Sequence, residues 1–154
     1  NVSLAVADQL EMVYLESVRE SRHGVFRRAE QGSRFPMELT ASGRAYLAGL
    51  NLLQRDTLLN KLASRHVSDW LKIRGEIDEA VQEIDRVGYC VASWQPGLTA
   101  IAAPLVAPDR SLYSVSIGFH LVAGQQQELV QRYAPMLLQL VDDIHASWDR
   151  RCRP

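Results

Sequence analysis

The residues that could support catalysis in this sequence are its histidines and the serines of its strand-like segments. The four histidines are His23, His66, His120 and His145. No two of them have the i, i+4 spacing by which a helix presents two metal ligands. A serine–histidine–aspartate set can be drawn from Ser116, His120 and Asp109, but no Gly-x-Ser-x-Gly elbow and no phosphate-loop GK[ST] is present. We therefore predict no catalytic residue, no metal, no cofactor and no enzymatic activity.

The stretch ELTASGRAYLAGL, residues 38–50, suggests a different chemistry, the binding of an anion. Thr40 is a good N-cap for a helix. Ala41, Ser42 and Gly43 would then form the first turn, where backbone N–H groups lack partners within the helix and the helix dipole is positive. Such an end can hold a carboxylate or phosphate. Close packing of the helix end on a neighbouring strand is the alternative, and Gly43 and Gly49 suit both.

The composition fits one globular domain of ordinary size. The chain has 154 residues, 47% hydrophobic and 23% charged, with a net charge of −1. It lacks the basic excess of nucleic-acid binders, a membrane-spanning apolar run and a signal peptide pattern. Cys90 and Cys152 form no CxxC, which favours a reducing, cytoplasmic location. Because the sequence opens at Asn1 directly in a strand-like pattern, we expect an excised domain.

The alternation of apolar residues and the turn signals predict five or six strands that pair antiparallel. These strands are 2–6, 12–18, 24–30, 88–93, 99–107 and 112–120. Helices are predicted from Thr40, over 54–66, over 74–87 and from about 125 to 148, with Gly88 ending the third and Pro135 kinking or dividing the last. The order of strands, three helices, strands and helix is typical of an α+β fold with helices on an antiparallel sheet.

Two segments resemble a known family. GSRFPMELTASGRAYLAGL, residues 32–50, resembles the lead into the first helix of the effector-binding domain of IclR-type transcriptional regulators, the isocitrate lyase regulator family. VGYCVASWQPGLTAIAAPL, residues 87–105, resembles the second signature of that family, in which a helix ends at Gly-Tyr and a loop leads to an IAAP strand. The similarity covers residues 1–148, including the opening hairpin, so the whole of 1–154 is read as one effector-binding domain.

The resemblance implies a GAF-like or profilin-like fold, a curved antiparallel sheet with helices packed on it. It implies a winged helix-turn-helix DNA-binding domain N-terminal to this chain, and a cytoplasmic homodimer or homotetramer that contacts DNA only through that domain and does not contact membranes. Members bind small organic acids between the sheet and the loop before the first helix.

Carried over residue by residue, the resemblance implies a pocket for such an acid. Its predicted residues are Arg27, Phe35, Ala41, Ser42, Ala92, Trp94, Ala100, Ser116 and Gly118. Ala92 and Ala100 stand where other members often have an acidic residue and a cysteine. This more apolar wall favours a bulkier or aromatic acid, with Arg27 gripping the carboxylate and with Phe35 and Trp94 supplying flat contacts.

Each of these residues also has an ordinary structural interpretation. Arg27 suits a surface position beside Arg28, Trp94 a loop anchor, and Ser116 a plain strand position. A different class of function, a GAF-like sensor or dimerisation module without a small-acid ligand, therefore stays open. The sequence upstream of Asn1 distinguishes it from an acid-binding regulator domain, because a winged helix there supports the regulator.

Overall fold

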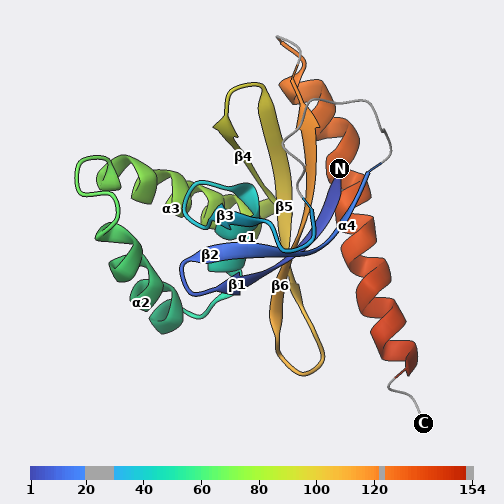
Figure 1. Cartoon of the computed structure of the whole chain (residues 1–154). Coiled ribbons are helices and arrows are strands. Elements are labelled where there is room, and N and C mark those ends of the chain that lie inside the picture. Colours follow the sequence, from blue (N-terminus) through green and yellow to red (C-terminus); the bar gives the residue numbers. More distant parts are fainter. Residues whose placement is uncertain (20–29, 122–123, 152–154) are drawn as a thin grey trace.

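The computed structural model describes residues 1–19, 30–121 and 124–151. As predicted, the fold is α+β, with a six-stranded antiparallel sheet in the order β3-β2-β1-β6-β5-β4 and helices on both faces (Figure 1). The strands are β1 (Val2–Asp8), β2 (Glu11–Val18), β3 (Arg34–Pro36), β4 (Cys90–Gln95), β5 (Leu98–Val106) and β6 (Leu112–His120). The helices are α1 (Ala41–Gly49), α2 (Leu52–Ala63), α3 (Trp70–Val87) and α4 (Gln126–Arg151).

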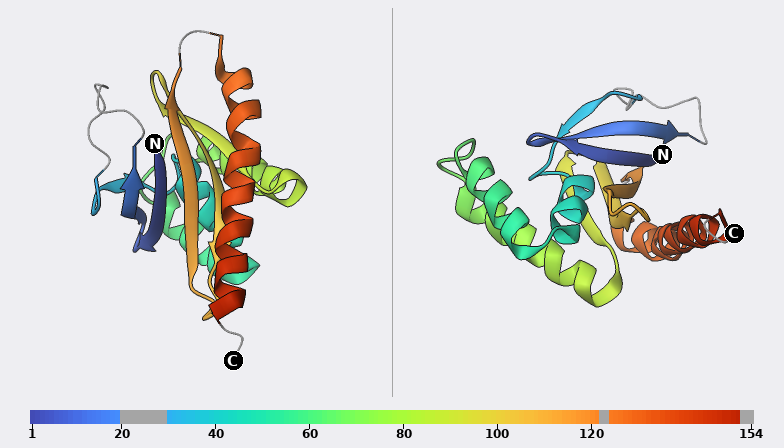
Figure 2. Two further views of the ribbon diagram at one scale, coloured as in Figure 1. Left: turned by 90° about the vertical axis from the view of Figure 1, so that its right-hand side faces the viewer. Right: turned by 90° about the horizontal axis from the view of Figure 1, so that it is seen from below.

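Most predicted elements are confirmed, with shifted ends. Helix α1 begins directly after Thr40, and Gly88 ends α3 in the left-handed conformation, with φ of 88°. Helix α3 begins at Trp70 rather than 74, and α2 begins two residues before its predicted start at 54. Helix α4 runs through Pro135 as one helix, so this proline does not begin a second one (Figure 2).

The third predicted strand, 24–30, lies outside the described residues except for Glu30, which is not in a strand. In the described residues, the strand next to β2 at the edge of the sheet is instead β3, which pairs with β2 through Met12 and Phe35. Only three residues long, β3 gives too short an alternation to be recognised in the sequence.

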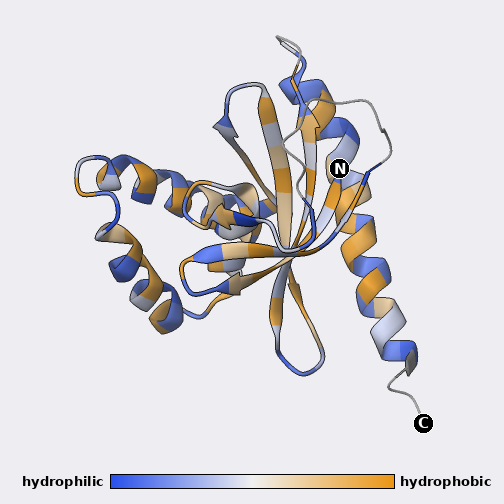
Figure 3. Ribbon diagram, viewed as in Figure 1, coloured by the Kyte–Doolittle hydropathy of each residue, from blue (hydrophilic) through white to orange (hydrophobic). Residues whose placement is uncertain are grey.

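The sheet has one helix on one face and three on the other. Helix α4 packs on β5 and β6 around Ile101, Val115, Ile117 and Leu137. Figure 3 shows hydrophobic and hydrophilic segments alternating along α4, as expected for a helix that buries one stripe. Among the described helices, none is long and apolar enough to cross a membrane.

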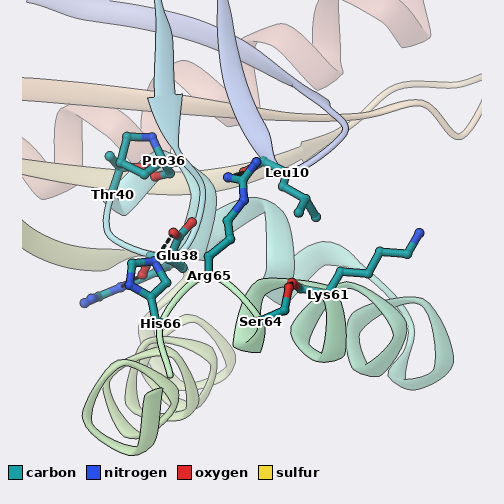
Figure 4. A network of polar contacts seen from close by, with 9 residues as sticks. Leu10, Pro36, Glu38, Thr40, Lys61, Ser64, Arg65 and His66 are labelled. Carbon is teal, nitrogen blue, oxygen red and sulfur yellow. Dashed lines mark hydrogen bonds and ion pairs between the residues drawn. The ribbon is translucent and has the colours of Figure 1, made fainter. Parts of the chain in front are cut away.

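The three helices of the opposite face, α1–α3, enclose a second core. Met12, Met37, Leu47, Leu59, Leu62 and Ile77 are fully buried there. A contact between two polar side chains holds the loop that precedes α1. The His66 ring, from the α2–α3 connection, points at the Glu38 carboxylate in the loop before α1, with Nε2 and Oε1 2.5 Å apart (Figure 4). This contact fixes the loop that leads into α1.

The sheet curls strongly, so that its two edge strands approach each other. Phe35 of β3 and Trp94 of β4 stand at opposite ends of the strand order, yet their ring centroids are only 6.3 Å apart in an edge-to-face arrangement. The face covered by α1–α3 is therefore concave, and we call it the concave face.

Candidate functional site

The floor of the concave face is made of small residues. Ala92, Ala100 and Gly118 are direct cross-strand partners on β4, β5 and β6. A side-chain carbon added at Gly118 would meet no atom within 4 Å. The sheet thus leaves open space above Gly118, although the neighbouring positions Ala92 and Ser116 are buried.

Aromatic rings stand around this floor. Tyr14 of β2 and Phe35 of β3 have ring centroids 4.6 Å apart, and Phe35 in turn meets Trp94. The three rings come from β2, β3 and β4, so the curl of the sheet brings them together. Phe35 and Trp94 were predicted as site residues, and the structure places both beside the predicted floor.

The N-terminal end of α1 closes the site on one side. Thr40 caps the helix as predicted, because its Oγ1 accepts a hydrogen bond from the Gly43 N–H at 3.2 Å. Ala41 and Ser42 form the first turn, where N–H groups have no acceptor within the helix. Both residues are buried, and Ser42 Oγ lies 2.5 Å from Ser114 Oγ of β6. The helix end therefore sits against the same strand that carries Ser116 and Gly118.

The two glycines of α1 are explained by close packing. A side-chain carbon at Gly43 would lie 2.0 Å from the Met37 carbonyl oxygen, and one at Gly49 would lie 2.6 Å from Leu112 Cδ1. Packing thus accounts for the glycines themselves, whereas Ala41 and Ser42 remain candidates for holding an anion.

A group of hydroxyls lines the floor next to Ser116. The Tyr14 hydroxyl lies near the buried Ser116 and Ser3 side chains. Burial raises the pKa of Tyr14 above its usual value, and the neighbouring Ser116 and Ser3 side chains partly offset this rise. Tyr14 is therefore neutral near pH 7 and has one proton to donate.

Sequence reasoning did not place Tyr14 in the site, although plain alternation with the buried Met12 puts both residues on the same face of the sheet. In the β1–β2 pair, Ala5 faces Tyr14 but Leu4 faces Glu16, so Leu15 is the extra residue. Ser17 Oγ lies 3.2 Å from Ser3 Oγ, because the bulge brings Ser17 to the same face as Tyr14. Strict alternation would put them on opposite faces.

A cavity of about 500 Å³ opens beside this floor. Its lining includes Ala92, Trp94, Arg44, Lys72 and Glu76. The buried Arg44 guanidinium donates to Glu76 Oε2 at 2.5 Å and to the Glu38 carbonyl oxygen at 3.1 Å, and Lys72 lies 3.9 Å from Glu76. Two cations share one carboxylate, which suits an anionic ligand. Arg44 was not predicted, although its place directly after the bare helix turn could have indicated it.

A larger open cleft, of about 690 Å³, adjoins this cavity at Val91 and Gln126. It is lined by β4, the start of α4 and the segment between β6 and α4, including Tyr89, Val91 and Val130, and contains none of the predicted site residues. We favour the concave face as the site because its polar groups converge there.

The structure brings the predicted residues it describes to one region, the concave face and the adjoining end of α1. The remaining predicted residue, Arg27, lies outside the described residues. The serine–histidine–aspartate alternative is excluded by position. Asp109 precedes β6 and His120 ends it, so the nine-residue strand, roughly 27 Å long, separates them. In the part of the chain that is described, no group of three or more potential ligands could hold a metal ion.

A curled antiparallel sheet with an enclosed face between helices defines an α+β sensory domain of the GAF-like class. The family described as "Bacterial transcriptional regulator IclR C-terminal" matches residues 1–146. The chain belongs to this family and is the effector-binding domain of an IclR-type transcriptional regulator, not an enzyme.

Individual relatives agree with this assignment. The chain is 28% identical over 160 positions to the HTH-type transcriptional regulator TsaQ1/TsaQ2 of Comamonas testosteroni, matching 99% of this chain and 56% of that protein. A crystal structure of an IclR family regulator from Brucella abortus has a TM-score of 0.86 at 27% identity, covering 95% of this chain and 56% of that one. The chain thus spans little more than half the length of these relatives.

A third similar structure supports the fold alone. It is the inducer-binding domain of the PobR transcription factor from Acinetobacter, a double mutant in complex with 3-hydroxybenzoic acid. Its TM-score is 0.71 at 18% identity, with 93% of this chain and 86% of that chain covered.

Proposed function

We propose that this domain binds a small aromatic carboxylic acid on its concave face. We further propose that the bound acid changes the DNA affinity of a winged helix-turn-helix domain that precedes Asn1 in the full-length protein. The observation that carries the proposal is the open space above Gly118, floored by Ala92 and Ala100, next to the first turn of α1. A flat apolar ring suits this floor.

In this proposal the carboxylate lies at the α1 end. The N–H groups of Ala41 and Ser42 point out of the first helical turn, and the partial positive charge of the helix favours an anion there. Arg44, from the same helix, adds a buried cation near the site. Arg27 is proposed as a further carboxylate ligand. PobR, which is similar in fold, was crystallised with an aromatic acid, as expected if this fold can hold one.

A thermal-shift screen tests the proposal. The purified protein is heated with aromatic and aliphatic carboxylic acids, and with the matching amides as controls. At about 100 times its dissociation constant an acid adds about 2.7 kcal/mol to the free energy of unfolding, roughly 5–10 °C in melting temperature. No shift with any acid, or equal shifts with acids and amides, would contradict an anion site.

One substitution, with a matched control, then tests where the carboxylate binds. Arg27→Ala should weaken acid binding in titration calorimetry while leaving the melting temperature of the free protein unchanged. Arg74→Ala is a matched control, because Arg74 pairs with Asp78 on α3 and does not line the cavity. Unchanged affinity in Arg27→Ala would remove this residue from the site.

Assembly without a small acid is a second candidate function. The α2–α3 pair exposes large apolar side chains, with Val67 and Leu71 89% and 90% exposed. Apolar exposure of this kind marks contact surfaces, and a homodimer or homotetramer is part of our proposal. Light scattering of the wild type and of Leu71→Glu tests it, and an equal mass for both would exclude Leu71 from the interface.

A further inference from the structure

A carboxylate of the protein itself occupies the buried cation of the candidate site. The side chain of Arg44 on α1 is only 9% exposed, and its Nη2 donates to Glu76 Oε2 on α3 at 2.5 Å. Both side chains line the cavity that is also lined by Ala92 and Trp94. The positive charge that suits an anionic ligand is therefore already neutralised by a residue of the same cavity.

The hydrogen-bonding geometry of Arg44 makes this an exclusive choice. An arginine holds a carboxylate best through two parallel hydrogen bonds. The planar guanidinium offers two edges for this, Nε with Nη2 and Nη1 with Nη2, so Nη2 belongs to both. Nε already donates to the Glu38 carbonyl oxygen at 3.1 Å, and Nη2 donates to Glu76. A ligand carboxylate and the Glu76 carboxylate therefore compete for the same nitrogen.

Glu76 can leave Arg44 without losing every partner. Lys72 Nζ, one turn earlier on α3, lies 3.9 Å from Glu76 Oε1. The Glu76 side chain is also 38% exposed, so water can solvate its carboxylate. Arg44 has no such freedom, because a buried cation without a counter-charge is strongly unfavourable. The exchange that costs least is therefore one carboxylate for another on Arg44, with Lys72 and water receiving Glu76.

We propose that Glu76 is an internal competitor for Arg44, and that a bound acid displaces it and so loosens the contact of α3 with α1. This proposal rests on the proposed function and adds how the acid changes the domain. The Arg44–Glu76 pair joins the two helices directly. Ile73 and Ile77 of α3 are buried in the second core, so the helix keeps its place while its charged contact with α1 opens.

The competition also sets the concentration of acid to which the domain responds. When a binding site is available in only a fraction of the molecules, the apparent affinity of the ligand is reduced by that fraction. Arg44 is available only while Glu76 is turned away from it. A carboxylate therefore binds more weakly than the site alone would allow, whereas a neutral amide does not compete with Glu76 and is not affected.

The first test measures benzoate binding to the full-length protein by calorimetry. Glu76→Gln keeps the length of the side chain and removes its charge, so benzoate should bind at least about tenfold more tightly than to the wild type. The affinity for benzamide should not change, which separates a lost competitor from a general loosening of the cavity.

Glu83→Gln is the matched control for this test. Glu83 lies on the same helix and pairs with Arg86, and it does not line the cavity. Its replacement removes one negative charge from α3 and should leave benzoate binding as in the wild type. Unchanged benzoate affinity in Glu76→Gln would overturn the competition. Weaker binding would overturn it too, because Glu76 would then help Arg44 to hold the acid.

The second test measures how α3 responds in the wild type. Bound ligands usually slow amide exchange by stabilising the folded state. We expect the opposite for the amides of residues 73–80, which should exchange with deuterium at least about twofold faster with benzoate than without it. Unchanged or slower exchange there would overturn the loosening of α3.

The two proposals fail in different ways. If benzoate binds the wild type and binds Glu76→Gln no more tightly, the competition is wrong and the proposed function stands. If benzoate binds Glu76→Gln alone, both proposals are supported. If no acid of the thermal-shift screen binds either protein, the proposed function fails and the competition fails with it.

Discussion

The two faces of the β5–β6 hairpin differ in what they place under their helices. Toward α4 the hairpin presents large apolar side chains, with Ile101, Leu105 and Val115 buried in one cluster. Toward α1 the alternate positions of the same two strands are small or hydroxylated, as at Ala102 and Ser116. One face is filled by its own side chains, and the other leaves room and polar groups for something else.

Along a single strand of the hairpin, residues that stabilise the fold therefore alternate with residues that are available for binding a ligand. A close-packed face contributes most of the free energy of folding, because burial of large apolar side chains does so. A face of alanine, serine and glycine contributes less, but it can tolerate a ligand without having to move large side chains. The predictions below test this division of the sheet, beginning with the largest expected effect.

Removing a large side chain from the α4 face should be costly. Leu137 is fully buried in the cluster under α4. Leu137→Ala should lower the free energy of unfolding by about 2–5 kcal/mol, because it leaves a cavity. Urea denaturation measures the loss. Leu53→Ala is the control, because Leu53 is 78% exposed and its change should stay within about 0.5 kcal/mol. A loss below about 1 kcal/mol at Leu137 would mean that the α4 face is not close-packed.

The sequence was sufficient to predict the strands of the hairpin and the helices, because their periods are long and regular. It also predicted the cap at Thr40 and the stop at Gly88, since both depend on local backbone chemistry. The resemblance brought Phe35, Trp94 and Gly118 into one predicted site, which remains a prediction as a binding site.

What the sequence could not provide depends on contacts between distant segments. Tyr14 joins the site through its ring contact with Phe35, which depends on the pairing of β2 with β3. Arg44 became part of it through Glu38 and Glu76, which lie in the preceding loop and on α3. The meeting of the two sheet edges follows from the accumulated twist of six strands, which no local pattern contains.

Adding one side-chain carbon at Gly43 should disrupt the contact of α1 with the loop before it. A glycine replaced by alanine inside a helix normally gains about 1 kcal/mol. At Gly43 the new carbon would collide with the Met37 backbone, so Gly43→Ala should instead lose about 1–3 kcal/mol. Gly75→Ala on α3 is the matched control, because its new carbon would meet nothing within 4 Å and the usual gain should appear. Equal effects at both positions in thermal unfolding would show that α1 is not packed this closely.

The buried thiol between α1 and β4 should make the concave face sensitive to alkali. Burial raises the pKa of Cys90 to about 12 from 9.0, and its Sγ donates to the Ala41 carbonyl oxygen. A raised pKa means that the stabilisation is complete below pH 9 and is lost as the pH rises toward 12. At pH 10 the unfolded state is favoured by about 1.4 kcal/mol more than at neutral pH. Comparing urea unfolding at pH 8 and pH 10 should show this loss in the wild type and not in Cys90→Ala. The same loss in both would place its origin at another group.

The smallest effect on stability should come from Gly118, and it should be a gain. Gly118 lies in β6, and a side-chain carbon there would meet nothing within 4 Å. Gly118→Ala should therefore raise the free energy of unfolding by about 0.5–1 kcal/mol, since glycine weakens a strand. The same carbon would occupy the space proposed for the ligand ring, so the affinity for bulky acids such as 4-tert-butylbenzoate should fall more than that for benzoate. Calorimetry on both acids, together with thermal unfolding, separates the two effects. A more stable variant with unchanged selectivity would mean that the open space above Gly118 is not where the ring lies, and the contrast between the two faces would then concern packing alone.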